Sequence, residues 1–150
     1  TTSMADLFLH LPFARRLRFA EGLHPLAGEA IGRRPALVIL GATLAARLGL
    51  GFVPVRKAGK LPWKTFRESF TLEYGQDAVE VHQDAASAGE RLLLVDDLLA
   101  TGGTAAAAVR VLRRTGAEVV GCGFVVELGG QDGRRNLHGL EVFSLVLVPA

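Results

Sequence analysis

The segment from Leu92 to Thr104, LLLVDDLLATGGT, constrains the fold of this chain more than any other part of it. An apolar stretch ends in two consecutive carboxylates, Asp96 and Asp97, and continues through small residues into the helical stretch Ala105–Arg114. Carboxylates accept hydrogen bonds from sugar hydroxyls or approach a hydrated metal ion. The backbone N–H groups at the start of a helix have no partners within it and favour an anion such as a phosphate. The segment therefore predicts a site for a ligand that carries both a ribose diol and a 5′-phosphate.

The elements around this segment predict an α/β fold. A buried strand is expected at Arg91–Val95, a helix at Thr104–Thr115 and another strand at Glu118–Glu127. Strand, helix and strand in this order form a right-handed unit with parallel strands. We therefore expect a mostly parallel, twisted sheet flanked by helices, with Asp96 and Asp97 at the carboxyl edge where ligands bind.

The rest of the chain is less regular. Alternating residues at Phe70–Tyr74 and Ala78–His82 predict a hairpin, and Ala36–Leu40 is too short to distinguish a strand from a helix. The remaining expectations are an amphipathic helix over Met4–Phe19, a helix over Thr43–Leu48, a strand over Phe52–Arg56, a long loop over Lys57–Glu68 and a last strand over Leu140–Val148.

Length and composition favour a single domain over residues 1–150, since 49% of the residues are hydrophobic. No stretch of about 18 residues is apolar throughout, so no membrane span is expected. The net charge of +2, without a basic stripe, gives no reason to expect nucleic-acid binding. Cys122 is the single cysteine, which excludes an internal disulfide and makes the reducing cytoplasm the expected compartment.

Other loops that bind phosphate differ from this one. No lysine follows the glycines, as it does in a Walker loop, and the G-x-G-x-x-G pattern is absent. A strand followed by two aspartates also occurs in the acidic metal pocket of receiver-type domains, or as an ordinary turn with exposed carboxylates. The Thr101–Thr104 sequence, TGGT, fits neither well.

Val95–Thr104 resembles the 5-phosphoribosyl 1-diphosphate (PRPP) signature of type I phosphoribosyltransferases, in the version of the adenine phosphoribosyltransferases. The resemblance extends over Leu44–Pro62, Ser69–Gly75 and Glu90–Thr104. It implies a type I phosphoribosyltransferase-like fold with a hairpin lid. It also implies that AMP and diphosphate are formed from adenine and PRPP, with Mg²⁺ that no side chain ligates directly, in a homodimer.

Asp96 and Asp97 can hold the ribose 2′- and 3′-hydroxyls and support the positive charge that develops on the ribose during the reaction. The next part of the segment can hold the 5′-phosphate through backbone donors and two hydroxyls. These residues are Ala100, Thr101, Gly102, Gly103 and Thr104.

The resemblance assigns pyrophosphate to three basic residues, Arg56, Lys57 and Lys60, and implies that they can act across a dimer interface. Composition alone favours a solvated basic loop, and the match to the family's Arg-Lys-x-Gly-Lys run reverses that preference. Glu73 corresponds to a glutamate that exchanges a proton with adenine N7, although it could also be an outward-facing hairpin residue. Tyr74 and Leu99 are expected to pack against the ribose or the base.

Two parts of the family pattern are missing. A Gly-x-x-x-Arg-Gly loop that binds pyrophosphate would place its Arg-Gly pair at Ala36 and Leu37. Residues 1–35 form a divergent N-terminal arm without the Phe-x-Asp segment that borders the adenine pocket. These differences leave an alternative function, a non-catalytic protein that binds PRPP or a nucleotide. The retained Glu73 and Arg56–Lys60 favour an enzyme.

Overall fold

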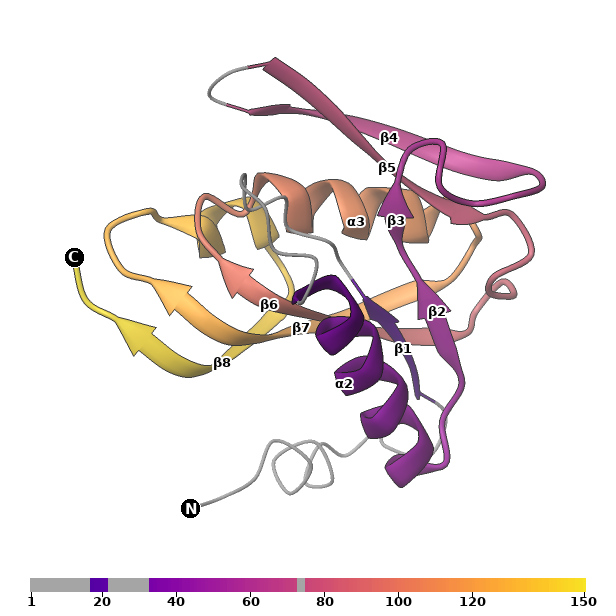
Figure 1. Cartoon of the computed structure of the whole chain (residues 1–150), viewed down its shortest axis with the longest axis horizontal. Helices are drawn as coiled ribbons and strands as arrows, with labels where there is room; N and C mark the ends of the chain where they lie inside the picture. The colour runs from indigo at the N-terminus through magenta and orange to yellow at the C-terminus, as the bar shows by residue number, and fades with distance from the viewer. Residues whose placement is uncertain (1–16, 22–32, 73–74) are drawn as a thin grey trace.

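The computed structural model describes residues 17–21, 33–72 and 75–150, and its strands form two sheets (Figure 1). Sheet A has five parallel strands in the order β2-β1-β6-β7-β8, and sheet B has three antiparallel strands in the order β3-β5-β4. In chain order the described elements are β1 (Leu17–Glu21), α2 (Arg33–Leu48), β2 (Phe52–Pro54), β3 (Arg56–Lys57), β4 (Thr65–Leu72), β5 (Gly75–His82), β6 (Arg91–Leu99), α3 (Gly103–Arg113), β7 (Glu118–Leu128), the 3₁₀ helix η2 (Gly133–Leu137) and β8 (Glu141–Val148).

The helix α3 lies between the two sheets, and α2 covers the opposite face of sheet A (Figure 1). Strand β6 is buried on both faces because it contacts both helices: Leu92 and Leu94 face α3, whereas Leu93 and Val95 face α2. Near-continuous apolar sequence is typical of such central parallel strands. The α/β fold with a mostly parallel sheet, expected from the sequence, is therefore confirmed.

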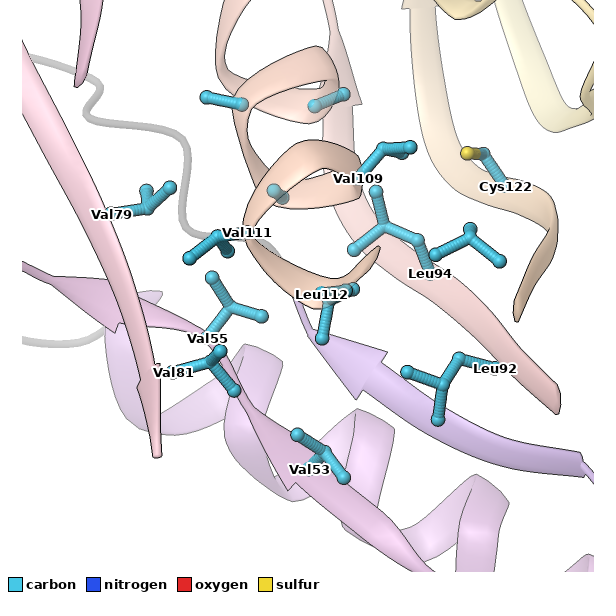
Figure 2. Packing of buried hydrophobic residues seen from close by; sticks show 14 of the residues in the cluster. Val53, Val55, Val79, Val81, Leu92, Leu94, Val109, Val111, Leu112 and Cys122 are labelled. Carbon is cyan, nitrogen blue, oxygen red and sulfur yellow. The ribbon is translucent and has the colours of Figure 1, made fainter. Parts of the chain in front are cut away.

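The main core surrounds α3. Figure 2 shows Val111 and Leu112 of this helix among side chains of both sheets, with Val81 from sheet B and Leu92 from sheet A. Alanines occupy much of the rest of the helix, and Ala105, Ala107 and Ala108 are also buried. Small side chains allow a helix to approach two sheets at once, so this composition suits a helix that is covered on two sides.

Several expected elements are confirmed with different ends. The hairpin is longer than predicted, because β4 begins at Thr65. The predicted loop Lys57–Glu68 is therefore too long, since Lys57 belongs to β3 and Thr65–Glu68 to β4. Ala36–Leu40, for which strand and helix were both open, is helical. Pro35 lies in the first turn of α2, where a missing N–H costs no hydrogen bond.

Two expectations are wrong because non-local pairing decides them. The predicted strand Phe52–Arg56 is divided between two sheets: β2 pairs with β1, whereas β3 pairs with β5. The predicted helix Met4–Phe19 fails at its end, where Leu17–Phe19 belongs to β1, paired with β2 and β6 on either side. The first part of that predicted helix, Met4–Arg16, lies outside the described residues.

No helix in the described ranges is both long and apolar enough to cross a membrane.

Truncating Leu112 to alanine should lower the free energy of unfolding by about 2–5 kcal/mol, because the side chain is fully buried between the sheets. The matched control is Leu147→Ala on β8, where the side chain is 64% exposed and the loss should stay within about 0.5 kcal/mol. Urea denaturation of both variants measures the difference. Equal losses would contradict the assignment of the core.

Candidate functional site

Two carboxylates lie near the carboxyl end of β6. Asp96 is almost fully buried and Asp97 is half-buried, and successive strand residues point to opposite faces of a sheet. The backbone N–H of Asp97 donates to Asp96 Oδ1 at 3.0 Å. Asp97 Oδ1 is buried and finds no hydrogen-bond partner among the described residues. A buried carboxylate oxygen without a donor is costly, so this atom indicates a place where a ligand or water supplies one.

The helix α3 starts four residues after β6 ends, and its first turn faces the same edge of sheet A. Gly102 is the N-cap residue, with a left-handed backbone (φ 78°) and no side-chain cap. The N–H groups of the first turn have no acceptors within a helix, and the helix dipole is positive at this end. Thr104 adds a hydroxyl in this turn. The structure thus brings the predicted carboxylates and the predicted anion-binding turn together on one strand–helix connection.

The 3₁₀ helix η2 supports this connection from behind, and sequence reasoning missed it because only a glycine and polar residues after β7 mark its place. Gly133 packs so closely that a Cβ on Gly102 would collide with its carbonyl group. A Cβ on Gly133 would in turn collide with the carbonyl oxygen of Ala100. Asn136 Nδ2 donates to the carbonyl oxygen of Thr101 at 2.7 Å. Both glycines are therefore required by close contact between the two backbones.

A charged cluster fixes η2 to sheet A. Arg134 makes a bidentate ion pair with Glu127 of β7, with nitrogen–oxygen distances of 2.7 and 2.6 Å, and donates to the carbonyl oxygen of Val142 at 3.0 Å. Ser144 Oγ donates to the same carboxylate at 2.6 Å. The hydrogen bond with Arg134 lowers the pKa of Glu127 and, with that of Ser144, outweighs the effect of burial, which raises it. Planar bidentate pairs are among the strongest charged contacts, so this cluster holds η2 in one orientation.

The three basic residues predicted to bind pyrophosphate are divided between a strand and a loop. Arg56 and Lys57 lie on β3, whereas Lys60 lies in the connection to β4 and is exposed. Arg56 Nε is buried without a hydrogen-bond partner in the part of the chain that the structure describes. Lys57 Nζ forms an ion pair with Asp77 Oδ2 at 2.6 Å. Arg56 and Lys57 thus belong to sheet B, whereas Asp96 and Asp97 belong to sheet A.

The other predicted site residues have different outcomes. Glu73 and Tyr74 lie outside the described residues, so their roles stay predictions. Leu99 is buried in the main core, and its packing against a ribose or base also stays a prediction.

Burial raises the pKa of Cys122 to about 12. This thiol is therefore protonated at neutral pH and is a core residue rather than a nucleophile.

Comparison with known proteins agrees with this geometry. Residues 37–146 match the family model described as "Phosphoribosyl transferase domain". An adenine phosphoribosyltransferase of Desulfitobacterium hafniense is 57% identical over 72% of this chain, and the match spans 62% of that relative. One from Ruegeria pomeroyi is 46% identical over 97% of this chain and 82% of its own length.

The chain belongs to the adenine phosphoribosyltransferase family.

A solved structure of the family from Saccharomyces cerevisiae, in complex with D-2,5-dideoxy-2,5-imino-altritol 1,6-bisphosphate and adenine, superposes with a TM-score of 0.75. It is 38% identical to this chain and matches 93% of it, which is 71% of the yeast chain. The type I phosphoribosyltransferase fold is thereby confirmed. The positions Ala36 and Leu37, where the Arg-Gly pair of the family loop would fall, lie inside α2 in this family member.

The contact between Gly102 and η2 predicts that Gly102→Ala destabilises the protein much more than Gly49→Ala. Both glycines have a positive φ, so both alanines carry the left-handed strain of about 1–2 kcal/mol. At Gly102 the added Cβ would also collide with the backbone of Gly133, whereas a Cβ at Gly49 meets nothing within 4 Å. Thermal unfolding of the two variants measures this difference. Similar melting temperatures would show that η2 can move away without cost.

The lowered pKa of Glu127 predicts an acid-dependent loss of stability. A carboxylate with a folded-state pKa below its ordinary value of 4.5 stabilises the fold above that pH, and this contribution is lost as the pH falls through the lowered pKa. Glu127→Gln should therefore lose less stability than the parent chain when the pH is lowered from about 6 to about 3. Urea denaturation at each pH checks this, with exposed Glu118→Gln as control. Parallel curves for Glu127→Gln and the parent would contradict the pKa direction.

Proposed function

We propose that this chain transfers the 5-phosphoribosyl group of PRPP to adenine and so forms AMP and diphosphate. The strand–helix connection from Asp96 to Thr104 carries the proposal, because a buried carboxylate oxygen without a donor lies next to an uncapped helix start. A ribose 5-phosphate supplies hydroxyl donors for the carboxylate oxygen and an anion for the start of the helix. Membership of the family, with relatives named for adenine, supports the choice of base.

The ribose half of the reaction uses groups that are already in position. The bond from C1′ to pyrophosphate breaks while positive charge develops on the ribose ring. Asp97 Oδ1 accepts a hydrogen bond from a ribose hydroxyl, and both carboxylates place negative charge near the ring. The first turn of α3 holds the 5′-phosphate and so fixes the distance between the sugar and the strand.

The leaving pyrophosphate is proposed to bind Arg56, Lys57 and Lys60. Arg56 Nε has a donor to offer, since it lacks a partner among the residues described. Lys57 must leave Asp77, but a partly exposed ion pair contributes only about 0–1 kcal/mol. Charge-assisted hydrogen bonds to an anion are worth roughly 1.5–3 kcal/mol, so the exchange favours binding. These three cations supply part of the pyrophosphate binding that the Arg-Gly loop provides in the family pattern.

Magnesium is the proposed cofactor. The described residues contain no group of three or more His, Cys, Asp or Glu side chains suited to hold a metal ion. Mg²⁺ keeps several waters and commonly binds through one or two carboxylates plus substrate oxygens, which fits Asp96 and Asp97 as hydrogen-bond acceptors for its waters. When bound, the ion neutralises part of the charge on the pyrophosphate.

The N9 atom of adenine bonds to C1′ as pyrophosphate leaves, and the base must lose one ring proton in total, which can leave from N7. Glu73 is proposed to exchange that proton, on the resemblance of its sequence to the family's hairpin. In the sequence it follows Leu72, the last residue of β4. Tyr74 and Leu99 are proposed to pack against the ribose or base. A carboxyl group covered on ligand binding has the raised pKa that such an exchange requires.

The homodimer and the cytoplasmic location are also proposals. The resemblance to the family supports the dimer, and the lone, buried Cys122 is compatible with a reducing compartment. Size-exclusion chromatography with light scattering gives the mass of the particle. A monomer at all concentrations would contradict a dimer.

Incubation with PRPP, Mg²⁺ and each purine base, followed by measurement of diphosphate release, tests the activity. Adenine should react faster than guanine or hypoxanthine. Tight binding of PRPP or AMP without any product would refute the proposed enzyme and support the non-catalytic alternative.

Replacing Glu73 by glutamine should lower kcat with adenine by roughly 10²–10⁴-fold, the usual contribution of a general acid or base. The affinity for PRPP should change little, because the carboxyl group acts on the base. Isothermal titration with PRPP and a steady-state assay separate the two quantities. Equal losses in PRPP affinity and kcat would show that Glu73 has a structural role.

A further inference from the structure

The connection between β3 and β4, residues 58–64, runs along β5, the central strand of sheet B, and is held at both ends by backbone hydrogen bonds. Ala58 N donates to the carbonyl oxygen of Ala78 at 2.9 Å, and Gln83 N donates to that of Lys64 at 3.1 Å. The imidazole Nε2 of His82 lies 2.7 Å from the carbonyl oxygen of Pro62. All three partners belong to β5 or the residue after it, so loop 58–64 folds back along this strand.

Glu80 lies near the carboxyl end of β5 and binds the backbone of loop 58–64. Its Oε1 accepts hydrogen bonds from Lys60 N and Leu61 N, each at 2.8 Å, and its Oε2 lies 3.4 Å from Thr65 Oγ1. The residue is only 5% exposed. Burial raises the pKa of Glu80, but the backbone donors of Leu61, Gly59 and Lys60 and the hydroxyl of Thr65 outweigh it, so the pKa is lower than usual. Glu80 is therefore a buried, ionised carboxylate whose donors come mainly from one loop.

The same residue pairs with the strand that carries Arg56. Arg56 is opposite Glu80 in the antiparallel register of β3 and β5, so the two Cβ atoms lie on the same face of sheet B, roughly 4.5–5.5 Å apart. Despite this proximity, no ion pair joins Arg56 to Glu80 within the described ranges, and Arg56 Nε is buried without a partner. The Glu80 carboxylate thus takes its hydrogen bonds from two main-chain N–H groups and the hydroxyl of Thr65, and leaves the Arg56 Nε available.

We propose that Glu80 is a positioning residue for the pyrophosphate subsite, which holds the backbone of Lys60 beside Arg56 so that both cations meet the same anion. The inference rests on the proposed function, because it needs pyrophosphate to bind there. Glu80 itself does not touch the substrate. Its negative charge is partly neutralised by the two backbone N–H donors of Lys60 and Leu61, so it organises the cations at little electrostatic cost to binding.

The variant Glu80→Gln tests this role with little change in size. An amide offers one acceptor and turns an NH₂ group towards donors, so the loop loses at least one of its hydrogen bonds. The Kd for PRPP, measured by titration calorimetry with Mg²⁺, and its KM should both rise about tenfold, a factor typical of removing one hydrogen bond to a charged group. The KM for adenine should stay unchanged. Glu80→Asp, which keeps the charge but is shorter, should fall between the parent and Glu80→Gln.

Glu68→Gln is the matched control. Glu68 is a half-buried carboxylate of the same hairpin, and it pairs with Arg110 of α3 at 2.7 Å rather than with loop 58–64. Its replacement should leave the Kd for PRPP unchanged. An equal rise in both variants, or an equal rise in the KM for PRPP and for adenine in Glu80→Gln, would overturn the positioning role.

Hydrogen exchange of the Lys60 and Leu61 amides gives a readout that does not depend on activity. Both amides should exchange slowly in the parent chain and at least about tenfold faster in Glu80→Gln. Fast exchange in the parent would overturn the inference, even if Glu80→Gln failed to fold. A parent chain that binds no PRPP refutes the proposed function itself. A parent chain that binds PRPP, with Glu80→Gln equally tight, refutes only the role of Glu80.

Discussion

The burial of α3 between two sheets is the constraint on which the rest of the molecule depends. Its alanines allow sheet A and sheet B to approach from opposite sides, and Leu112 and Val111 fill the remaining space. The same helix presents its first turn at the carboxyl edge of sheet A. Because core packing fixes the axis of the helix, it also fixes where the proposed anion-binding turn lies relative to Asp97. The helix α3 therefore both stabilises the core and positions the proposed ligand site.

The two halves of the proposed site are built differently. The ribose-phosphate half stands on a buried strand and a buried helix, and a second backbone at Gly133 leaves it no space to relax. The pyrophosphate half stands on a two-residue strand and on loop 58–64, where Lys60 is exposed. A preformed cradle suits the group that keeps its position throughout the reaction. A more adaptable set of cations suits pyrophosphate, which is bonded to the ribose in the substrate and is released as a free anion.

The sequence predicts the segments in which local pattern and neighbours agree. The β6–α3–β7 unit is such a case, because an apolar run, glycines at the turn and a small-residue helix all indicate the same structure. Prediction failed at β1 and at the division between β2 and β3, where pairing with distant strands decides the outcome. The supports of the site, Glu80 and η2, were missed for the same reason. Their partners lie about 15–35 residues away in sequence, and a lone glutamate or a short GRRN segment gives no periodic signal.

The contact between Gly102 and Gly133 also has a consequence for the order in which the molecule is made. During translation β6 and α3 are synthesised before η2. The charged cluster that holds η2 also includes Val142 and Ser144 of β8. A nascent chain that has emerged only as far as β7 contains every residue of the phosphate turn but not the backbone that braces it. The backbone that braces the proposed phosphate turn is thus complete only after the last strand of sheet A has been synthesised.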